Sequence, residues 1–293
     1  MSRKVVVIGA LDTKGKDFAF VKERIEERGF KAIVVDVGVM GEPSFKPDID
    51  ADTVAKAGGE SLSSLREKGD KGNAMAVMTK GAAVIAKNLY EEGHLDAIFG
   101  MGGSAGTAII SAAMRALPLG VPKVLVSTVA SGDTKPYVGT KDIVMVPSIV
   151  DVAGVNVISA EIYSLAVGAI VGMMETNVPK IESKPLIAAS MFGNTTQLIN
   201  QCKDIMERAD YEVMVFHATG TGGMTMEDLI ENGYFVAALD LTTTELADEL
   251  CGGVMSAGPK RLTTAGLKGI PQVVAPGCLD MVNFWAIETV PER

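Results

Sequence analysis

The sequence has few cysteines, histidines and aromatic residues. Of its 293 residues, 3 are cysteine and 2 are histidine, and 5% are aromatic. Cys202, Cys251 and Cys278 show no CxxC spacing, so the sequence predicts neither a disulfide framework nor a zinc ribbon. We expect small buried thiols in a reducing compartment, with Cys278 a weak candidate for a nucleophile. There is no HExxH motif and no histidine pair with metal-ligand spacing, so a metal-ligand set is not predicted.

The sequence also lacks an excess of positive charge. It carries 27 Lys and Arg against 36 Asp and Glu, which gives a net charge of −9. Proteins that bind nucleic acid present a basic surface to the phosphates, and single-strand binders stack bases on aromatic side chains. We therefore expect no nucleic-acid partner, although a few local lysines could still serve one phosphorylated ligand.

No apolar run predicts a signal peptide or a membrane span. The first run, Val5–Ala10, ends before Asp12, and the longest, Ile162–Met174, contains small and polar breaks typical of a buried helix. Hydrophobic residues make up 47% of the chain, as in an ordinary globular protein. We therefore predict a cytoplasmic protein with no membrane partner.

What the sequence contains is an alternation of strand-like and helix-like segments. Val5–Ile8 is a β-branched run typical of a strand buried on both faces, and Asp17–Arg28 has helical spacing. The alternation predicts an α/β fold of two Rossmann-like subdomains, each a mostly parallel sheet flanked by helices. A polar segment between two prolines, Asn177–Pro185, marks the boundary. We place the domains at 1–180 and 181–293.

The same patterns predict the remaining elements. Residues 41–52 are interpreted as an excursion loop. The predicted strands are 31–37, 97–99, 123–127, 142–146, 186–190, 211–217, 235–239 and 271–275, and the predicted helices are 73–92, 160–175, 196–208 and 224–232. In parallel sheets, ligands bind beyond the carboxyl ends of the strands, where most glycine-rich loops of this sequence fall.

One glycine-rich loop, Gly100–Thr107, lies between a predicted strand and an apolar helix. Glycines let the backbone approach an anion, and the free amides of the first helical turn point toward it. The spacing matches neither a Walker A motif nor a dinucleotide fingerprint, so close packing of helix on strand is an alternative. The nucleotide-binding candidates here are Gly102, Gly103, Ser104, Ala105, Gly106 and Thr107.

Two other loops of the first half present similar groups at the same predicted edge. The first brings together a carboxylate, a hydroxyl and an ammonium, which could meet a ribose or magnesium and a phosphate, or could simply cap a helix. The second follows the strand 123–127 and contains another Gly-Asp-Thr-Lys cluster. Their candidates are Asp12, Thr13, Lys14, Thr128, Gly132, Asp133 and Thr134.

The second half has a histidine beside a glycine loop. His217 ends a predicted strand and could be an acid, a base or a hydrogen-bond donor to substrate, or could be structural. His94 lies in a polar segment and is interpreted as a surface residue. A hydroxyl cluster follows the next strand, at 240–245. The candidates for a second ligand are Thr219, Gly220, Gly222 and Gly223.

Four of these segments together are distinctive. Val6–Gly15, Gly100–Thr107, His217–Gly223 and Gly252–Leu262 resemble the ATP-binding domain family of the tomato mosaic virus resistance protein, which has bacterial stand-alone members of unassigned activity. The resemblance covers nearly the whole chain. It implies two Rossmann-like subdomains, ATP with Mg²⁺ as ligand, and a homo-oligomer. Members of the family are longer, which leaves open whether the second domain is complete at its C-terminus.

The leading hypothesis is an ATP-using or ATP-regulated enzyme. ATP would occupy the loops of the first domain, and a small-molecule substrate would lie in an interdomain cleft where His217 and Thr219–Gly223 face Gly102–Thr107. One alternative is a regulatory module that senses nucleotide and acts through protein contacts. Another is an ATP-independent enzyme acting on a small oxo- or hydroxy-acid. The sequence does not name the reaction.

Overall fold

The structure is a computed structural model that describes residues 3–179, 181–182 and 184–291. The chain divides into two compact units, Met1–Val178 and Pro179–Arg293, which are called unit 1 and unit 2 and are described separately. Lys180, the last residue of the predicted first domain, lies outside the described residues.

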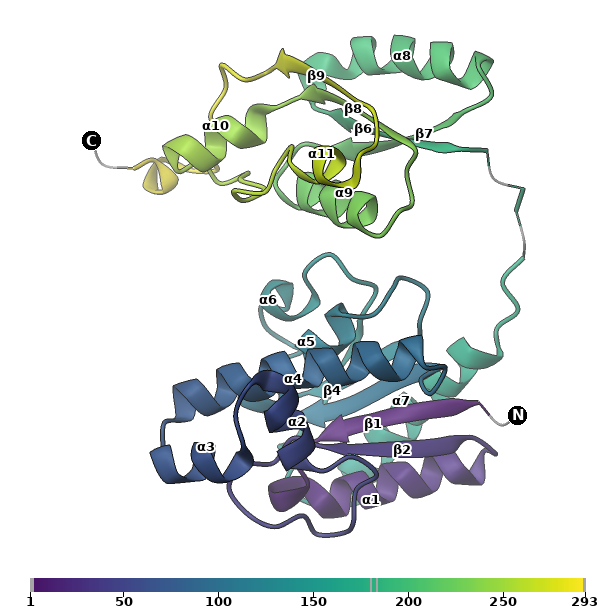
Figure 1. The fold of residues 1–293 in the computed structure, drawn as a ribbon, viewed down its shortest axis with the longest axis vertical. Coiled ribbons are helices and arrows are strands. Elements are labelled where there is room, and N and C mark those ends of the chain that lie inside the picture. Colours follow the sequence, from purple (N-terminus) through teal and green to yellow (C-terminus); the bar gives the residue numbers. More distant parts are fainter. Residues whose placement is uncertain (1–2, 180, 183, 292–293) are drawn as a thin grey trace. The chain divides into compact units, whose positions relative to one another are not determined.

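Unit 1 contains a parallel sheet of five strands in the order β2-β1-β3-β4-β5 (Figure 1). All of its strand pairs are parallel. Its strands are β1 (Lys4–Gly9), β2 (Lys31–Asp36), β3 (Ala97–Gly102), β4 (Lys123–Ser127) and β5 (Val144–Pro147). Its helices are α1 (Leu11–Glu27), α2 (Ala51–Gly58), α3 (Leu62–Lys68), α4 (Lys71–Glu91), α5 (Ser104–Arg115), α6 (Lys135–Val138) and α7 (Val157–Glu175).

Helices cover both faces of this sheet because side chains alternate along each strand. Val5 and Val7 of β1 pack with α1 and α7 on one face. Val6 and Ile8 pack with α2, α4 and α5 on the other. The β-branched run that predicted a doubly covered strand is thus explained by two separate apolar layers, each beneath helices that Figure 1 shows on the two faces of the sheet.

Unit 2 contains a parallel sheet of four strands in the order β7-β6-β8-β9. Helix α8 covers one face, while α9 and α11 cover the other (Figure 1). Its strands are β6 (Leu186–Met191), β7 (Glu212–His217), β8 (Ala237–Thr242) and β9 (Gln272–Gly277). Its helices are α8 (Thr196–Arg208), α9 (Thr221–Glu231), α10 (Thr244–Cys251) and α11 (Thr264–Lys268), with short 3-10 turns η1 (Gly193–Thr195) and η2 (Ile287–Thr289). Two sheets of parallel strands flanked by helices confirm the predicted fold class.

Several helices begin earlier than the sequence predicted. Helix α1 starts at Leu11 rather than near Asp17, because the chain turns into the helix directly after β1 and is only kinked at Lys14. Helix α9 starts at Thr221, before the predicted 224. Helices α2 and α3 were not predicted. They are short, but the side chains of Asp50 and Ser61 accept backbone N–H bonds at their N-termini, as helix caps do.

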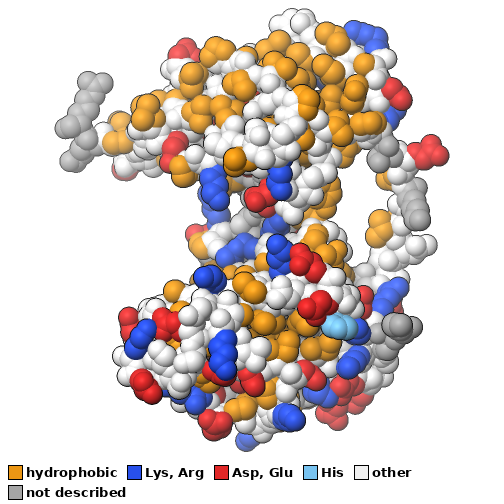
Figure 2. All heavy atoms as spheres, viewed as in Figure 1, with side chains coloured by type: hydrophobic (Ala, Val, Ile, Leu, Met, Phe, Trp, Pro, Cys, Tyr) orange, Lys and Arg blue, Asp and Glu red, His pale blue; other side chains and the backbone are white. Residues whose placement is uncertain are grey.

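Helix α7 is the one described helix long and apolar enough to cross a membrane by length and composition. It packs against α1, β3 and β4 with buried residues that include Tyr163, Val167 and Ile170, which is the position of a core helix. Figure 2 shows side chains of both charge signs on the visible face of unit 1.

Candidate functional site

A cavity of about 480 Å³ lies at the carboxyl ends of β1 and β3. These strands are neighbours in the sheet, but the chain leaves β1 toward β2 on one side and leaves β3 toward β4 on the other. Such a change of direction opens a crevice at the sheet edge, and it is where ligands bind in sheets of this order. The fold therefore places the cavity where a ligand is expected.

The walls of the cavity come from four parts of unit 1. The residues after β1 and the start of α5 supply polar groups, while α4 and the segment after β2 supply mostly apolar ones. The lining residues are Ala10, Asp12, Thr13, Lys14, Val37, Gly38, Val39, Met40, Lys71, Ala74, Met75, Met78, Met101, Gly102, Gly103, Ser104, Ala105, Gly106 and Ile109. The cavity thus joins two of the three predicted loops.

The N-terminus of α5 faces this cavity without a cap of its own. Gly103 is the N-cap residue and has no side chain to accept a bond from the first turn. The first backbone N–H inside the helix that finds a carbonyl is that of Thr107, which donates to Gly103 at 2.8 Å. The N–H groups of Ser104, Ala105 and Gly106 precede it and have no acceptor within the helix. They form a site suited to an anion.

Two glycines at this end of α5 have no packing reason to be glycine. A β-carbon on Gly103 would lie 3.8 Å from its nearest neighbour, and one on Gly106 would lie 3.9 Å away. Gly103 has φ −75°, which any residue adopts. By contrast, a β-carbon on Gly102 would lie 3.0 Å from the backbone of Gly106. Close packing therefore explains Gly102 but not Gly103 or Gly106.

Asp12 does not cap α1, because it lies inside the first turn and reaches across to the segment after β2. Its Oδ2 accepts the backbone N–H of Met40 at 2.9 Å and of Gly41 at 3.1 Å. Its Oδ1 is buried and has no hydrogen-bond partner among the described residues. A buried carboxylate oxygen is costly without a partner, so this atom is ready for a ligand group.

The segment after β2 is built around two carboxylates. The buried Asp36 accepts the backbone N–H of Leu11 at 3.0 Å and of Gly38 at 2.8 Å, which ties the ends of β1 and β2 together. Burial raises the pKa of Asp36, against the lowering effect of these two bonds. A β-carbon on Gly38 would lie 2.6 Å from Cγ of Asp12. Gly38 is thus required for Asp12 to occupy its place.

Lys14 and Thr107 are engaged within the protein. The Lys14 ammonium donates to the carbonyl of Val152, although the residue still lines the cavity. The fully buried Thr107 shares a hydrogen bond of 2.7 Å with Ser127 at the end of β4. Its hydroxyl connects α5 to β4 and does not line the cavity. Thr128 lines a separate cavity, and Gly132, Asp133 and Thr134 line neither of the two.

The apolar half of the cavity was missed by reasoning from the sequence. Lys71, Met75 and Met78 lie on α4, which starts more than thirty residues after the strand that precedes it. The spacing of Met75 and Met78 predicted one face of the helix 73–92 but not what that face covers, and Lys71 lies before the predicted start of that helix. Val39 and Met40 follow a strand end directly, and that position was a signal that could have included them.

In unit 2 the predicted glycine loop surrounds a carboxylate of the protein itself. Glu245, in the first turn of α10, accepts the backbone N–H of Gly220 at 2.7 Å and of Gly223 at 3.0 Å. These amides belong to the N-terminus of α9. A β-carbon on Gly223 would lie 2.1 Å from Oε2 of Glu245. The anion at this helix end is therefore a buried side chain.

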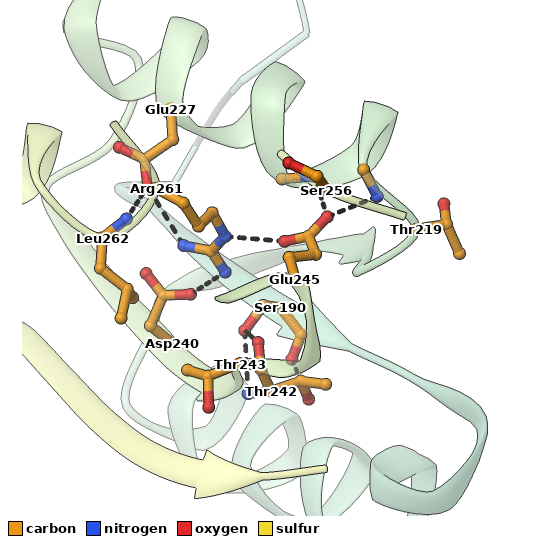
Figure 3. Close-up of polar contacts among 12 residues, drawn as sticks. Ser190, Thr219, Glu227, Asp240, Thr242, Thr243, Glu245, Ser256, Arg261 and Leu262 are labelled. Carbon is orange, nitrogen blue, oxygen red and sulfur yellow. Dashed lines mark hydrogen bonds and ion pairs between the residues drawn. The ribbon is translucent and has the colours of Figure 1, made fainter. Parts of the chain in front are cut away.

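Glu245 belongs to a buried ionic cluster around Arg261 (Figure 3). The Arg261 guanidinium donates to Glu245 at 2.7 Å, to Glu227 at 3.1 Å and to Asp240. Glu227 also accepts the backbone N–H of Leu262 at 2.6 Å, which holds the chain leading into α11. Burial raises the pKa of Glu245, against the lowering effect of Arg261. One cation thus serves three carboxylates.

The other predicted residues of unit 2 have local contacts only. The His217 side chain is exposed at the end of β7 and has no side-chain hydrogen bond to another described residue. A β-carbon on Gly222 would lie 1.7 Å from the His217 carbonyl oxygen, so the first turn of α9 packs on the strand end. Thr219 donates to that carbonyl through its backbone N–H at 2.8 Å. A cleft shared by the two units stays a prediction.

Comparison with protein families identifies the family of this chain. Residues 3–179 match the N-terminal domain, and residues 184–293 the C-terminal domain, of the family described as Uncharacterised protein family (UPF0261). The chain belongs to this family.

Its UPF0261 relatives include bacterial and plant proteins. The chain is 55% identical over 294 residues to a UPF0261 protein of Clostridium tetani, covering 100% of this chain and 73% of the relative. It is 37% identical over 316 residues to the ToMV resistance protein Tm-1 of Solanum lycopersicum, covering 99% of this chain and 41% of that protein. These matches confirm the resemblance to the tomato protein, whereas ATP binding stays a prediction.

Similarity to solved structures is weak. A UDP-N-acetylglucosamine 2-epimerase from Rickettsia bellii matches with a TM-score of 0.33 and 11% identity, covering 93% of this chain and 78% of that one. We base no argument on it.

Proposed function

We propose that unit 1 is a nucleotide-binding unit whose ligand is ATP with Mg²⁺. The observation that carries the proposal is the uncapped start of α5, where Gly103 and Gly106 face the switch-point cavity with no packing reason to be glycine. Inside a helix a glycine costs about 1 kcal/mol relative to alanine, and this cost applies to Gly106. Gly103 is the N-cap residue, where glycine is favoured over alanine, so the case for it rests on its place in the cavity wall. Close approach of a ligand to the backbone suits both positions.

The phosphates would lie at the start of α5. The N–H groups of Ser104, Ala105 and Gly106 would donate to phosphate oxygens, and the Ser104 and Thr13 hydroxyls line the same end. Lys71, at the first turn of α4, adds an ammonium to the cavity wall. This donor set would hydrogen-bond a polyphosphate without a Walker A lysine, and the Mg²⁺ that enters with the phosphates would balance more of their charge.

The base would lie against the apolar walls. Met75, Met78 and Met101 are flexible, polarisable side chains that adapt to a flat ring, and Val39 and Ile109 extend the same surface. A mostly apolar wall suits adenine, because guanine would leave more polar atoms unpaired. A volume of about 480 Å³ is within the range of ligand pockets in proteins.

The residues that line the cavity suit an Mg²⁺ ion that binds together with the phosphates of the nucleotide. Among the described residues no group of three or more His, Cys, Asp or Glu could hold a metal ion by itself. Mg²⁺ commonly binds through one or two carboxylates together with substrate phosphates. Asp12 is among the lining residues, and its carboxylate, whose buried Oδ1 has no partner among the described residues, would accept a magnesium-bound water or a ribose hydroxyl after a small side-chain movement.

The test is stabilisation by ligand. At 100 times its dissociation constant, ATP with Mg²⁺ should raise the free energy of unfolding by about 2.7 kcal/mol, measured as a rise in Tm. Gly103→Val and Gly106→Val should remove this rise while leaving the circular dichroism spectrum unchanged. Gly172→Val is the matched control, because that helical glycine lies on α7 with nothing within 4 Å of a β-carbon.

The comparison ligands are GTP, AMP and inorganic triphosphate. Stabilisation by triphosphate alone to the same extent would reduce the site to a phosphate site. An unchanged Tm with ATP, alongside a shift with another phosphate, would refute the nucleotide assignment.

A further inference from the structure

Unit 1 has a second cavity, of about 290 Å³, that the proposed nucleotide does not use. It lies between the segments that follow β4 and β5, at the same edge of the sheet. Thr128, Ser131 and Ser148 bring hydroxyl groups to it, Asp151 brings a carboxylate, and Ile149 brings an aliphatic side chain. Its character is polar, in contrast to the methionine-lined cavity.

The segment after β5 holds Ile149 in an unusual backbone conformation. Ile149 has φ 64°, a left-handed value that is rare for a β-branched residue. The backbone N–H of Val150 donates to the carbonyl of Ser148 at 2.7 Å, which closes a three-residue turn around Ile149. The side chain of this strained residue is 69% exposed, so burial of its methyl groups does not compensate for the conformation.

Both ends of this segment are fixed by other elements. Ser148 donates its backbone N–H to the carbonyl of Ser127 at 3.1 Å and its hydroxyl to the carbonyl of Val150 at 2.6 Å. At the other end, the buried Asp17 of α1 accepts the backbone N–H of Gly154 at 3.0 Å. Strain that is held by surrounding bonds is typical of residues that meet a ligand.

Thr128 of the polar cavity contacts the start of α5, which lines the nucleotide cavity. Thr128 lines the polar cavity, and its backbone N–H donates to the carbonyl of Gly102 at 3.2 Å. Its hydroxyl oxygen is the nearest atom, at 3.8 Å, to a β-carbon placed on Gly103, which lines the other cavity. A molecule in the polar cavity would therefore lie beside the start of α5.

We propose that the polar cavity binds a small polyhydroxylated molecule, the second ligand of unit 1. Its hydroxyl groups exchange hydrogen bonds with Thr128, Ser131 and Asp151, and its C–H face packs on Ile149. No cationic side chain is among the described lining residues, and the Asp151 carboxylate disfavours an anion. This molecule would lie beside a phosphate of the nucleotide, and this part of the inference rests on the proposed nucleotide function.

The test follows two isoleucine δ1-methyl groups by NMR in the full chain labelled at isoleucine. Ile149 lines the polar cavity and Ile109 lines the nucleotide cavity, so each methyl reports on one site. The probes are myo-inositol and D-ribose for the polar cavity, malonate as an anion of similar size, and ADP with Mg²⁺ for the nucleotide cavity. Ile149→Val identifies the Ile149 signal.

We expect myo-inositol or D-ribose to shift the Ile149 methyl saturably in the millimolar range. Asp151→Ala and Thr128→Val should each weaken that binding about tenfold, because each removes one hydrogen-bond partner. Glu161→Gln, an exposed acid on α7, is the matched control and should leave it unchanged. A response of Ile149 to malonate but to neither polyol would overturn the ligand class.

The two proposals fail in different ways. A response of Ile109 to ADP without any response of Ile149 to the polyols would refute the polar subsite and leave the nucleotide site standing. A response of Ile149 without one of Ile109 would refute the nucleotide site and support the subsite as an independent binding site. If neither the Ile149 nor the Ile109 methyl signal shifted with its ligands, both proposals would be refuted.

Discussion

Units 1 and 2 each have a helix N-terminus beside a glycine turn, but the backbone N–H groups at these two helix ends face different partners. In unit 1 the first amides of α5 face a cavity. In unit 2 the amides at the start of α9 hydrogen-bond the buried Glu245, which another helix supplies. The sequence predicted a nucleotide site at the first turn and a site for a second ligand at the second turn, because both are glycine-rich turns after a strand. A glycine-rich turn after a strand therefore predicts a binding position, and only the fold shows whether a side chain of the protein itself occupies it.

The test with the largest expected change in stability removes the cation, Arg261, from the buried ionic cluster of unit 2. Arg261→Leu leaves Glu227, Asp240 and Glu245 buried around no positive charge. We expect a loss of about 3–5 kcal/mol in the unfolding free energy of unit 2, measured by urea denaturation. ATP should still stabilise unit 1. Arg208→Leu, at the exposed end of α8, is the control, and an equal loss in that variant would contradict a structural role for the cluster.

A matched glycine pair sharpens the contrast directly. Gly223→Ala would force a β-carbon to within 2.1 Å of Glu245, so it should destabilise the protein by about 1–3 kcal/mol. Gly103→Ala has free space for its β-carbon and should cost at most about 0.5–1 kcal/mol, because alanine is a poorer N-cap than glycine, while weakening ATP binding. Thermal denaturation with and without ATP separates the two effects. If Gly103→Ala cost as much stability as Gly223→Ala, the distinction between the glycines would be lost.

These particular residues show what the sequence could predict. β-branched runs such as Val5–Ile8 predicted the strands, because burial on both faces of a parallel sheet demands them. The position of glycine loops at strand ends predicted the edge where Gly103 and Asp12 meet. The link between Glu245 and Gly223 was not predictable, because it joins residues on two helices through side-chain geometry alone. Met75 and Met78 were missed for the same reason, since α4 crosses over from a distant part of the chain.

The third test uses pH. Burial raises the pKa of Glu245 above its ordinary 4.5, so the folded protein keeps this proton at a pH where the unfolded chain has lost it. The stabilisation from this group is complete below pH 4.5 and is lost as pH rises through the folded-state pKa. The unfolding free energy of the wild type minus that of Glu245→Gln should fall as pH rises through the folded-state pKa of Glu245. A difference that grows with pH would mean that Arg261 outweighs burial.

The last prediction is a substitution that should have no effect on nucleotide binding. His217→Gln should leave the affinity for ATP unchanged, because the lining residues of the nucleotide cavity all belong to unit 1. Isothermal titration with ATP and Mg²⁺ measures this, with Gly103→Val as the variant that loses binding. A clear loss of affinity in His217→Gln would show that unit 2 contributes to the site and would remove the contrast between the units.

Each unit is one unbroken stretch of the chain, so the ribosome completes unit 1 before it begins unit 2. Every strand of the first sheet lies before residue 148, and the last helix of unit 1 ends at Glu175. During synthesis at 5–20 residues per second, the 115 residues Pro179–Arg293 take roughly 6 to 23 s to follow. The nascent unit 1 can complete its sheet in that interval, so the proposed nucleotide site can form while the ribosome is still translating unit 2.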